Sequence, residues 1–178
     1  MLKQVQFVGG VVLAGAVLVG CGDDDSSSGG PAPSNVWNGP TIEFSKFEDA
    51  DPTDPENQDR ITDNVIITRS LVGGPIYNAA VDNEPTAEEL MTDKDWSAIN
   101  GPSGTEWAIG DLNDALTLDY DNLRATLGNG QGAFQSIVGE SLVVHLLDDD
   151  VYVGVTFSEW GMGAAGKGVF VYERTTQP

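Results

Sequence analysis

The C-terminal third of the chain constrains the fold most, because three successive segments there have the pattern of β-strands. Residues 141–147 form an apolar run that would be buried on both faces, as a central strand is. After an aspartate turn at 148–150, apolar residues alternate with small or polar ones over 151–158, which predicts a strand with one buried face. A glycine-rich turn over 161–168 then leads into 169–172. These segments together predict a three-stranded meander.

The remainder of the chain adds short strands and little helix. Strands are predicted at 41–45, 64–69, 74–78 and 105–109. Thr86 and Glu89 have the spacing of a capping box, which predicts one or two helical turns over 85–91. Asp119 is placed to cap a second helix, which would end at Gly128. The pattern predicts an all-β fold, a single antiparallel β-sandwich of jelly-roll type with one or two short helices.

The N-terminus reads as an export signal. Lys3 is the only charged residue in 1–20, and an apolar run extends from Phe7 to Val19, shorter than the about 20 residues that a membrane-spanning helix needs. A basic start, a short apolar core and small residues at its end are typical of a secretory signal peptide.

The only cysteine of the chain follows this run directly. Residues 18–21 read LVGC, and they resemble the bacterial lipobox, an apolar residue and two small ones before a cysteine. The resemblance implies that the Cys21 thiol receives a diacylglycerol, that cleavage occurs just before it, and that the acyl chains hold the protein in a membrane. Because Gly22 follows Cys21, the resemblance to Gram-negative lipoproteins also implies delivery to the outer membrane, with the domain facing either the periplasm or the exterior.

Three regions follow from this interpretation: a signal peptide over 1–20, a lipidated flexible tether over 21–35, and a β-sandwich domain over 36–178. The tether is rich in Asp, Ser, Gly and Pro and carries too little apolar surface to fold. Its acidic run at 23–25 is either a solvated segment or a sorting signal. The chain has a formal net charge of −20, and loss of Lys3 would make it more negative, so nucleic acid is not an expected partner.

Several pieces of the domain are similar to a β-rich domain found in secreted bacterial proteins and lipoproteins. The pieces are residues 57–62 with 67–69, residues 104–110, and residues 145–174, which include Trp160 and the run GVFVYER over 168–174. That family has no established activity, so the resemblance implies secretion and a β-rich fold and supplies no catalytic residue.

The segment EDADPTDPENQD at 48–59 is the densest acidic stretch of the domain. Its carboxylates are oxygen donors of the kind that calcium takes, and the proposed ligands are Asp51, Asp54, Glu56 and Asp59. The spacing matches no EF-hand, so a solvated acidic connection is the competing interpretation. No other cofactor is indicated.

The sequence gives less support to a catalytic or sugar-binding role for its histidine and tryptophans. His145 is the sole histidine, lies in an apolar strand and has no Gly-x-Ser-x-Gly partner, which predicts a core histidine with one hydrogen bond rather than a hydrolase residue. Trp96 and Trp160 lie in polar or glycine-rich surroundings and are candidates for a sugar-binding surface, although aromatic residues more often pack in a core.

These observations predict a lipid-anchored envelope protein with a non-enzymatic binding or structural domain. The alternatives are a carbohydrate-binding module and, with least support, an envelope hydrolase that uses carboxylates. A glycan or another envelope protein is the expected partner beside the membrane.

Overall fold

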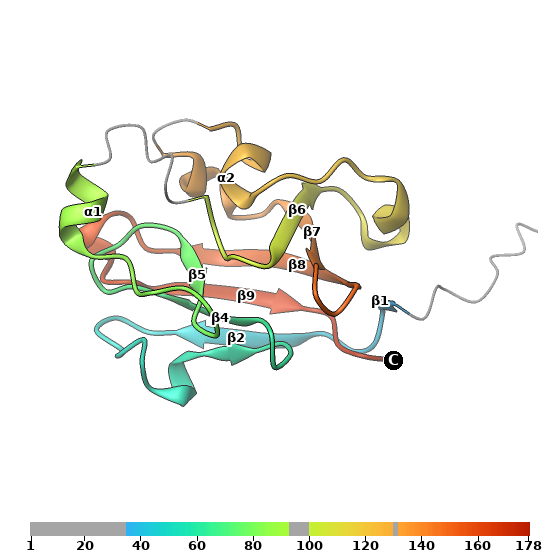
Figure 1. Cartoon of the computed structure of the whole chain (residues 1–178), viewed down its shortest axis with the longest axis horizontal. Coiled ribbons are helices and arrows are strands. Elements are labelled where there is room, and N and C mark those ends of the chain that lie inside the picture. Colours follow the sequence, from blue (N-terminus) through green and yellow to red (C-terminus); the bar gives the residue numbers. More distant parts are fainter. Residues whose placement is uncertain (1–34, 93–99, 130–131) are drawn as a thin grey trace, which may run out of the picture. The chain divides into compact units, whose positions relative to one another are not determined.

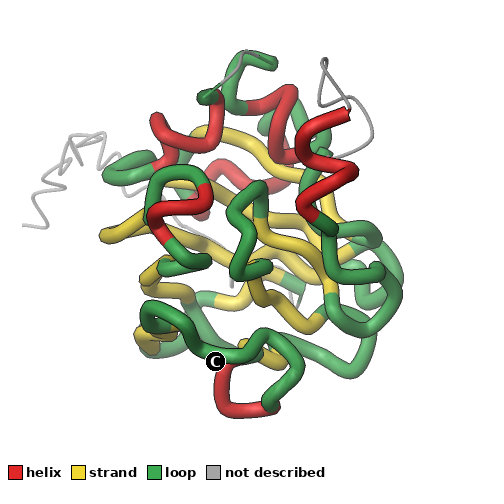
Figure 2. The backbone as a smooth tube through the Cα atoms, turned by 90° about the vertical axis from the view of Figure 1, so that its left-hand side faces the viewer, coloured by secondary structure: helices red, strands yellow, loops and turns green. Residues whose placement is uncertain are grey.

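The computed structural model describes residues 35–92, 100–129 and 132–178, and most of their regular structure is β. The nine strands in this part of the chain form a main sheet of six strands and a small sheet of three (Figure 1). Figure 2 shows the strands gathered in the middle, with the helical segments around them. The prediction of a mostly β fold with few short helices is confirmed.

The main sheet contains the C-terminal meander. Its strands are β1 (Val36–Trp37), β2 (Ile42–Lys46), β6 (Thr105–Ile109), β7 (Ser141–Leu146), β8 (Val151–Trp160) and β9 (Phe170–Arg174). They lie in the order β2-β9-β8-β7-β6, and each neighbouring pair in this order is antiparallel, while β1 pairs in parallel with β8. The predicted meander of β7, β8 and β9 is therefore confirmed. The sequential order of β6 to β9 does not confirm a jelly-roll connectivity.

The small sheet packs on one side of the main sheet. Its strands are β3 (Asp59–Arg60), β4 (Ile66–Arg69) and β5 (Ile76–Asn78), antiparallel in that order. Ile67 and Ile76 from the small sheet share one buried apolar cluster with Val144, Val153 and Phe157 of the main sheet. We call the side of the main sheet that carries these three residues the inner face, and the opposite side the outer face.

The helical segments are short. They are η1 (Pro55–Asn57), α1 (Ala87–Thr92), η2 (Leu112–Thr117), α2 (Leu123–Thr126), η3 (Ala133–Ile137) and η4 (Ala164–Gly166), where η denotes a 3₁₀ helix. The capping box before α1 is confirmed, since Thr86 N donates to Glu89 Oε2 at 2.8 Å and Glu89 N donates to Thr86 Oγ1 at 3.2 Å.

The second predicted helix starts later than expected. Asn122, not Asp119, caps α2, and its Oδ1 accepts from Ala125 N at 3.0 Å. The reason is a competing backbone pairing, because Asp121 forms an antiparallel bridge with Trp107 through hydrogen bonds of 2.7 and 3.0 Å. A residue engaged in this bridge is extended and does not belong to a helix.

A buried ion pair joins the two sheets. Arg174 on β9 binds both carboxylate oxygens of Asp59 on β3, with Nε–Oδ2 of 2.6 Å and Nη2–Oδ1 of 2.8 Å. The Tyr172 hydroxyl donates to the same Oδ2 at 2.5 Å. All three residues are buried, and the bidentate geometry fixes the position of β3 on the inner face.

Replacing Arg174 with Met is expected to lower the free energy of unfolding by about 3–5 kcal/mol, because it leaves the Asp59 carboxylate buried without its counter-ion. Chemical denaturation of the full-length chain measures this change. The matched control is Arg60→Met, which removes the exposed Arg60–Asp63 pair and should cost no more than about 1 kcal/mol. Equal losses in the two variants would contradict this role for Arg174.

Candidate functional site

The outer face of the main sheet is covered only in part. Val36 and Val143 are buried there beside Ala115 of η2, with Leu112 and Tyr152 packed against them. Farther along the sheet, the outer-face residues of β8 and β9 are exposed. The side chains of the outer face explain why one part is covered and the other exposed. Apolar residues lie under η2, and hydroxyl or carboxylate residues lie beyond it.

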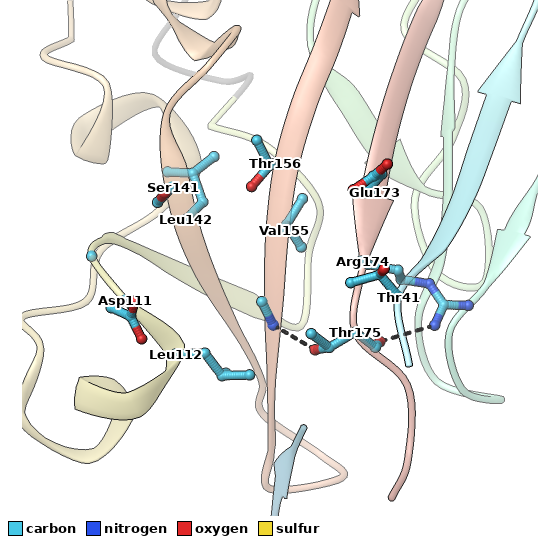
Figure 3. Close-up of a pocket in the computed structure, with 12 residues that line it drawn as sticks. Thr41, Asp111, Leu112, Ser141, Leu142, Val155, Thr156, Glu173, Arg174 and Thr175 are labelled. Atoms are coloured by element: carbon cyan, nitrogen blue, oxygen red, sulfur yellow. Dashed lines mark hydrogen bonds between the residues drawn. The ribbon is translucent and has the colours of Figure 1, made fainter. Parts of the chain in front are cut away.

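A recess of about 180 Å³ lies where the cover of η2 ends (Figure 3). Its floor includes Gly154, which has no side chain, and its N–H donates to Thr175 Oγ1 at 2.9 Å. The polar residues that line the recess are Thr41, Ser141, Thr156 and Thr175 with their hydroxyls, Asp111 and Glu173 with their carboxylates, and Arg174, whose guanidinium is held by Asp59 and donates to the Thr175 carbonyl at 3.4 Å. The recess can therefore offer several hydrogen-bond donors and acceptors to one small ligand.

Negative charge gathers along one side of this recess. Glu173 lies directly opposite Glu43 across the β2–β9 pair, and directly opposite Thr156 across the β8–β9 pair. Two like charges in opposite positions destabilise a strand pair slightly, and a positively charged ligand would relieve this repulsion. Asp111 is less free to bind a ligand, because its Oδ1 already accepts from Asn113 N and Nδ2 at 2.8 and 2.6 Å.

His145 lies on the outer face, and its environment differs from the prediction. Its Nδ1 is 2.8 Å from Glu106 Oε1, and its Nε2 is 3.1 Å from Asp150 Oδ1. The ring stacks on Tyr152 with a centroid distance of 4.2 Å and an interplanar angle of 4°. The expectation of a core histidine with one hydrogen bond was wrong, because the strand places Val144 and Leu146 inward and turns His145 toward the outer face.

Two of the buried cations, unlike Arg174, form no ion pair with the described residues. Lys46 at the end of β2 is fully buried, and its Nζ has no hydrogen-bond partner among the described residues. Arg69 at the end of β4 is 1% exposed and donates to the Gly74 and Val169 carbonyls at 2.8 and 2.7 Å. We call Lys46 and Arg69 the cationic pair.

Burial perturbs the ionisation of this region. Loss of solvent, followed by repulsion from Arg69, lowers the pKa of Lys46 below its ordinary value of 10.5. Burial also lowers the pKa of Arg69 to about 10. The pKa of the neighbouring Tyr77 is raised, first by burial and then by Glu84 and other carboxylates. Burial therefore disfavours the charged forms of both Lys46 and Arg69.

Trp160, one of the two predicted sugar-binding residues, packs against the core. The Arg69 guanidinium carbon lies 3.8 Å from its ring centroid, and Phe134 stacks at 6.0 Å. The ring is partly buried against the main apolar cluster. Trp160 therefore acts as a cation–π partner for Arg69. Trp96, the other candidate, lies outside the described residues, as does Cys21.

The four predicted calcium ligands lie in different environments. Asp51 accepts from Thr53 N and Oγ1 through its Oδ1, at 2.8 and 2.7 Å, and Asp59 is held by Arg174. Asp54 and Glu56 are exposed near η1. Within the described ranges, no group of three or more His, Cys, Asp or Glu side chains is arranged to hold a metal ion. Calcium binding at these residues stays a prediction.

No protein-family model, no curated protein and no solved structure matches the chain. Over residues 35–92, 100–129 and 132–178, no helix is both long and apolar enough to span a bilayer.

Sequence reasoning missed the cationic pair and the recess. One signal for Lys46 was present, because it shares the strand period with Ile42 and Phe44 and therefore belongs to their face. The recess has no signal in sequence, since it depends on where η2 stops covering β8 and β9.

Replacing Lys46 with Met is expected to raise the free energy of unfolding by about 1–3 kcal/mol at neutral pH, because a buried amine without a partner is removed. The unfavourable contribution of Lys46 to the stability of the unmodified chain should also shrink as pH rises toward 10.5. With the pKa of folded Lys46 lowered, the unfolded chain binds more protons in this window.

Urea denaturation of both proteins across neutral to alkaline pH measures this effect. The difference between the two stabilities should shrink as pH rises, whereas the ionisation of Tyr77 and other tyrosines affects both proteins alike. A destabilised Lys46→Met variant would show that the amine has a stabilising partner.

Proposed function

We propose that this chain is a lipid-anchored protein of the bacterial cell envelope, carried on the outer membrane, whose β domain binds a ligand and catalyses no reaction. The observation that carries the anchoring is the lipobox-like LVGC at 18–21, with Cys21 as the sole cysteine. Two acyl chains would hold such a protein stably in a membrane. The low-complexity stretch that follows would act as a tether between lipid and domain.

The recess on the outer face is the proposed binding site. Its hydroxyl groups and the carboxylate of Glu173 suit a ligand that carries several hydroxyl groups or an ammonium group. This chemistry also supports the alternative of a carbohydrate-binding module, because sugar hydroxyls pair with such donors and acceptors. The residues that line the recess include no aromatic side chain. In the carbohydrate-binding alternative, the sugar would therefore bind through polar contacts in the recess and not by stacking on Trp96 or Trp160.

The finer architecture is part of the same proposal. Both sheets contribute to one apolar cluster, which supports a β-sandwich. A jelly roll links its two sheets through successive Greek keys, and the meander of β6 to β9 gives that particular class no support.

The anchoring is tested by replacing Cys21 with Ser. In a bacterial host the variant should accumulate as an uncleaved precursor and should not incorporate labelled palmitate, because serine supplies no thiol for the diacylglycerol. The measurements are radiolabel incorporation and electrophoretic mobility. Unchanged labelling of the variant would contradict the assignment of Cys21.

The recess is tested by replacing Gly154 with Val. A Cβ at Gly154 would lie at an ordinary contact distance of 3.5 Å from Leu112 and Thr175, so the fold should tolerate it while the added methyl groups fill the floor. Binding of soluble peptidoglycan fragments, measured by calorimetry on the full-length chain in detergent, should weaken at least about tenfold.

The matched control for this experiment is Ser158→Val, which introduces the same side chain on β8 outside the recess. This variant should bind as the unmodified chain does. Equal binding by the Gly154 variant, or no binding by the unmodified chain to these fragments or to a panel of neutral oligosaccharides, would contradict the proposed site.

A further inference from the structure

The cationic pair is a buried feature that the proposed function does not use. Lys46 and Arg69 come from different sheets, and both side chains are buried at the end of the inner face. Lys46 Nζ has no solvent contact and no hydrogen-bond partner among the described residues. Buried ammonium groups are normally paired or hydrogen-bonded, since desolvation without compensation is costly.

The charge balance around the cationic pair is unusual for so acidic a chain. The chain has 28 carboxylate side chains and eight lysines and arginines, and yet no described carboxylate forms an ion pair with Lys46 or Arg69. The carboxylates of Glu84, Asp51 and Asp49 act on Lys46 only at a distance. Glu84 Oε1 accepts from Ser70 Oγ at 2.8 Å. Among the described residues, the cationic pair therefore has no carboxylate in direct contact with it.

We propose that Lys46 and Arg69 form a closed binding site for a small oxyanion, such as a phosphate, a sulfate or a carboxylate group. The ammonium of Lys46 would donate hydrogen bonds to the anion, and the guanidinium of Arg69 would add a second charge beside it. The bound anion would satisfy the orphaned Nζ and would offset the repulsion between the two cations.

The glycine-rich loop at 161–168 forms the cover of this site. A Cβ built on Gly168 would lie 3.0 Å from Lys46 Nζ and 2.6 Å from the Ser70 carbonyl oxygen. The backbone of Gly168 therefore lies directly against the amine, and a side chain at this position would not fit. The loop must shift for an anion to reach Lys46.

A surface ion pair holds this loop in place. Lys167 Nζ lies 2.8 Å from Glu48 Oε1 and 2.7 Å from Asp49 Oδ2, on the segment that follows β2. We call this contact the latch. Exposed ion pairs contribute little to stability, and Asp49 and Lys167 have left-handed φ values of 60° and 44° in this arrangement, which are uncommon for residues other than glycine. The latch is thus weak enough to open.

The experiment compares the melting temperature of the full-length chain in sodium sulfate, phosphate and acetate with that in sodium chloride at equal ionic strength. At least one oxyanion should give a concentration-dependent excess rise, because it binds the folded chain preferentially. In Lys46→Met the apparent Kd should be at least about tenfold weaker, since a hydrogen bond to a charged group is lost. The three anions distinguish phosphate, sulfate and carboxylate sources.

Two further variants complete the design. Arg60→Met removes an exposed cation and should keep the full excess rise. Lys167→Met opens the latch and should bind with similar affinity but faster, as followed by the fluorescence of Trp160 beside Arg69. Sulfate also stabilises proteins by exclusion from their surfaces, and that part of the rise should persist in Lys46→Met.

Two results would overturn the proposal. One is an excess rise of the same size in Lys46→Met as in the unmodified chain. The other is no excess rise from any of the three anions. Because Lys46→Met is expected to be at least as stable as the unmodified chain, a loss of binding in this variant is not explained by unfolding. An unchanged binding rate in Lys167→Met would overturn the role of the latch.

Discussion

The buried contact of Asp59 with Arg174 and Tyr172 is the constraint on which the two-sheet arrangement depends. It joins β3 of the small sheet to β9 of the main sheet through two charge-assisted bonds and a tyrosine hydroxyl. Apolar packing alone is not directional, whereas a bidentate ion pair fixes one relative position. The inner face is thereby closed, and the outer face of β8 and β9 is the one that the described residues leave exposed.

The buried cations differ in the partners that surround them. Arg174 has a carboxylate at hydrogen-bond distance, so its charge contributes to the fold. Lys46 has no partner of this kind among the described residues and Arg69 has only carbonyls and an aromatic ring. A protein keeps a buried, unpaired ammonium at a cost in stability. Buried groups with perturbed pKa values cluster at functional sites, and the anion site proposed for the cationic pair rests on this contrast.

Sequence patterns predicted the strands well because strand alternation is a local property. The strand predicted at 105–109 has the observed limits of β6, and the strands predicted at 141–147 and 151–158 nearly match β7 and β8. The start of α2 was missed, because the pairing of Asp121 with Trp107 depends on residues that are distant in sequence.

The candidate sites were predicted less well, for the same reason. Asp59 looked like one more carboxylate of an acidic loop, and only the fold brings Arg174 to it. His145 was predicted to be a core residue because its neighbours in the strand are apolar. Their apolar character does not show which face of the strand carries the histidine. The recess and the cationic pair form where segments far apart in sequence meet. No local sequence pattern therefore predicts either of them.

Ligand binding at the outer face is tested most directly by an NMR titration of the isotopically labelled full-length chain with soluble peptidoglycan fragments. Amide shift changes should be largest around Gly154, Thr156 and Glu173 in the recess, while Ile67 and Ile76 on the small sheet keep their shifts. Changes centred on the small sheet, with the recess unaffected, would contradict it.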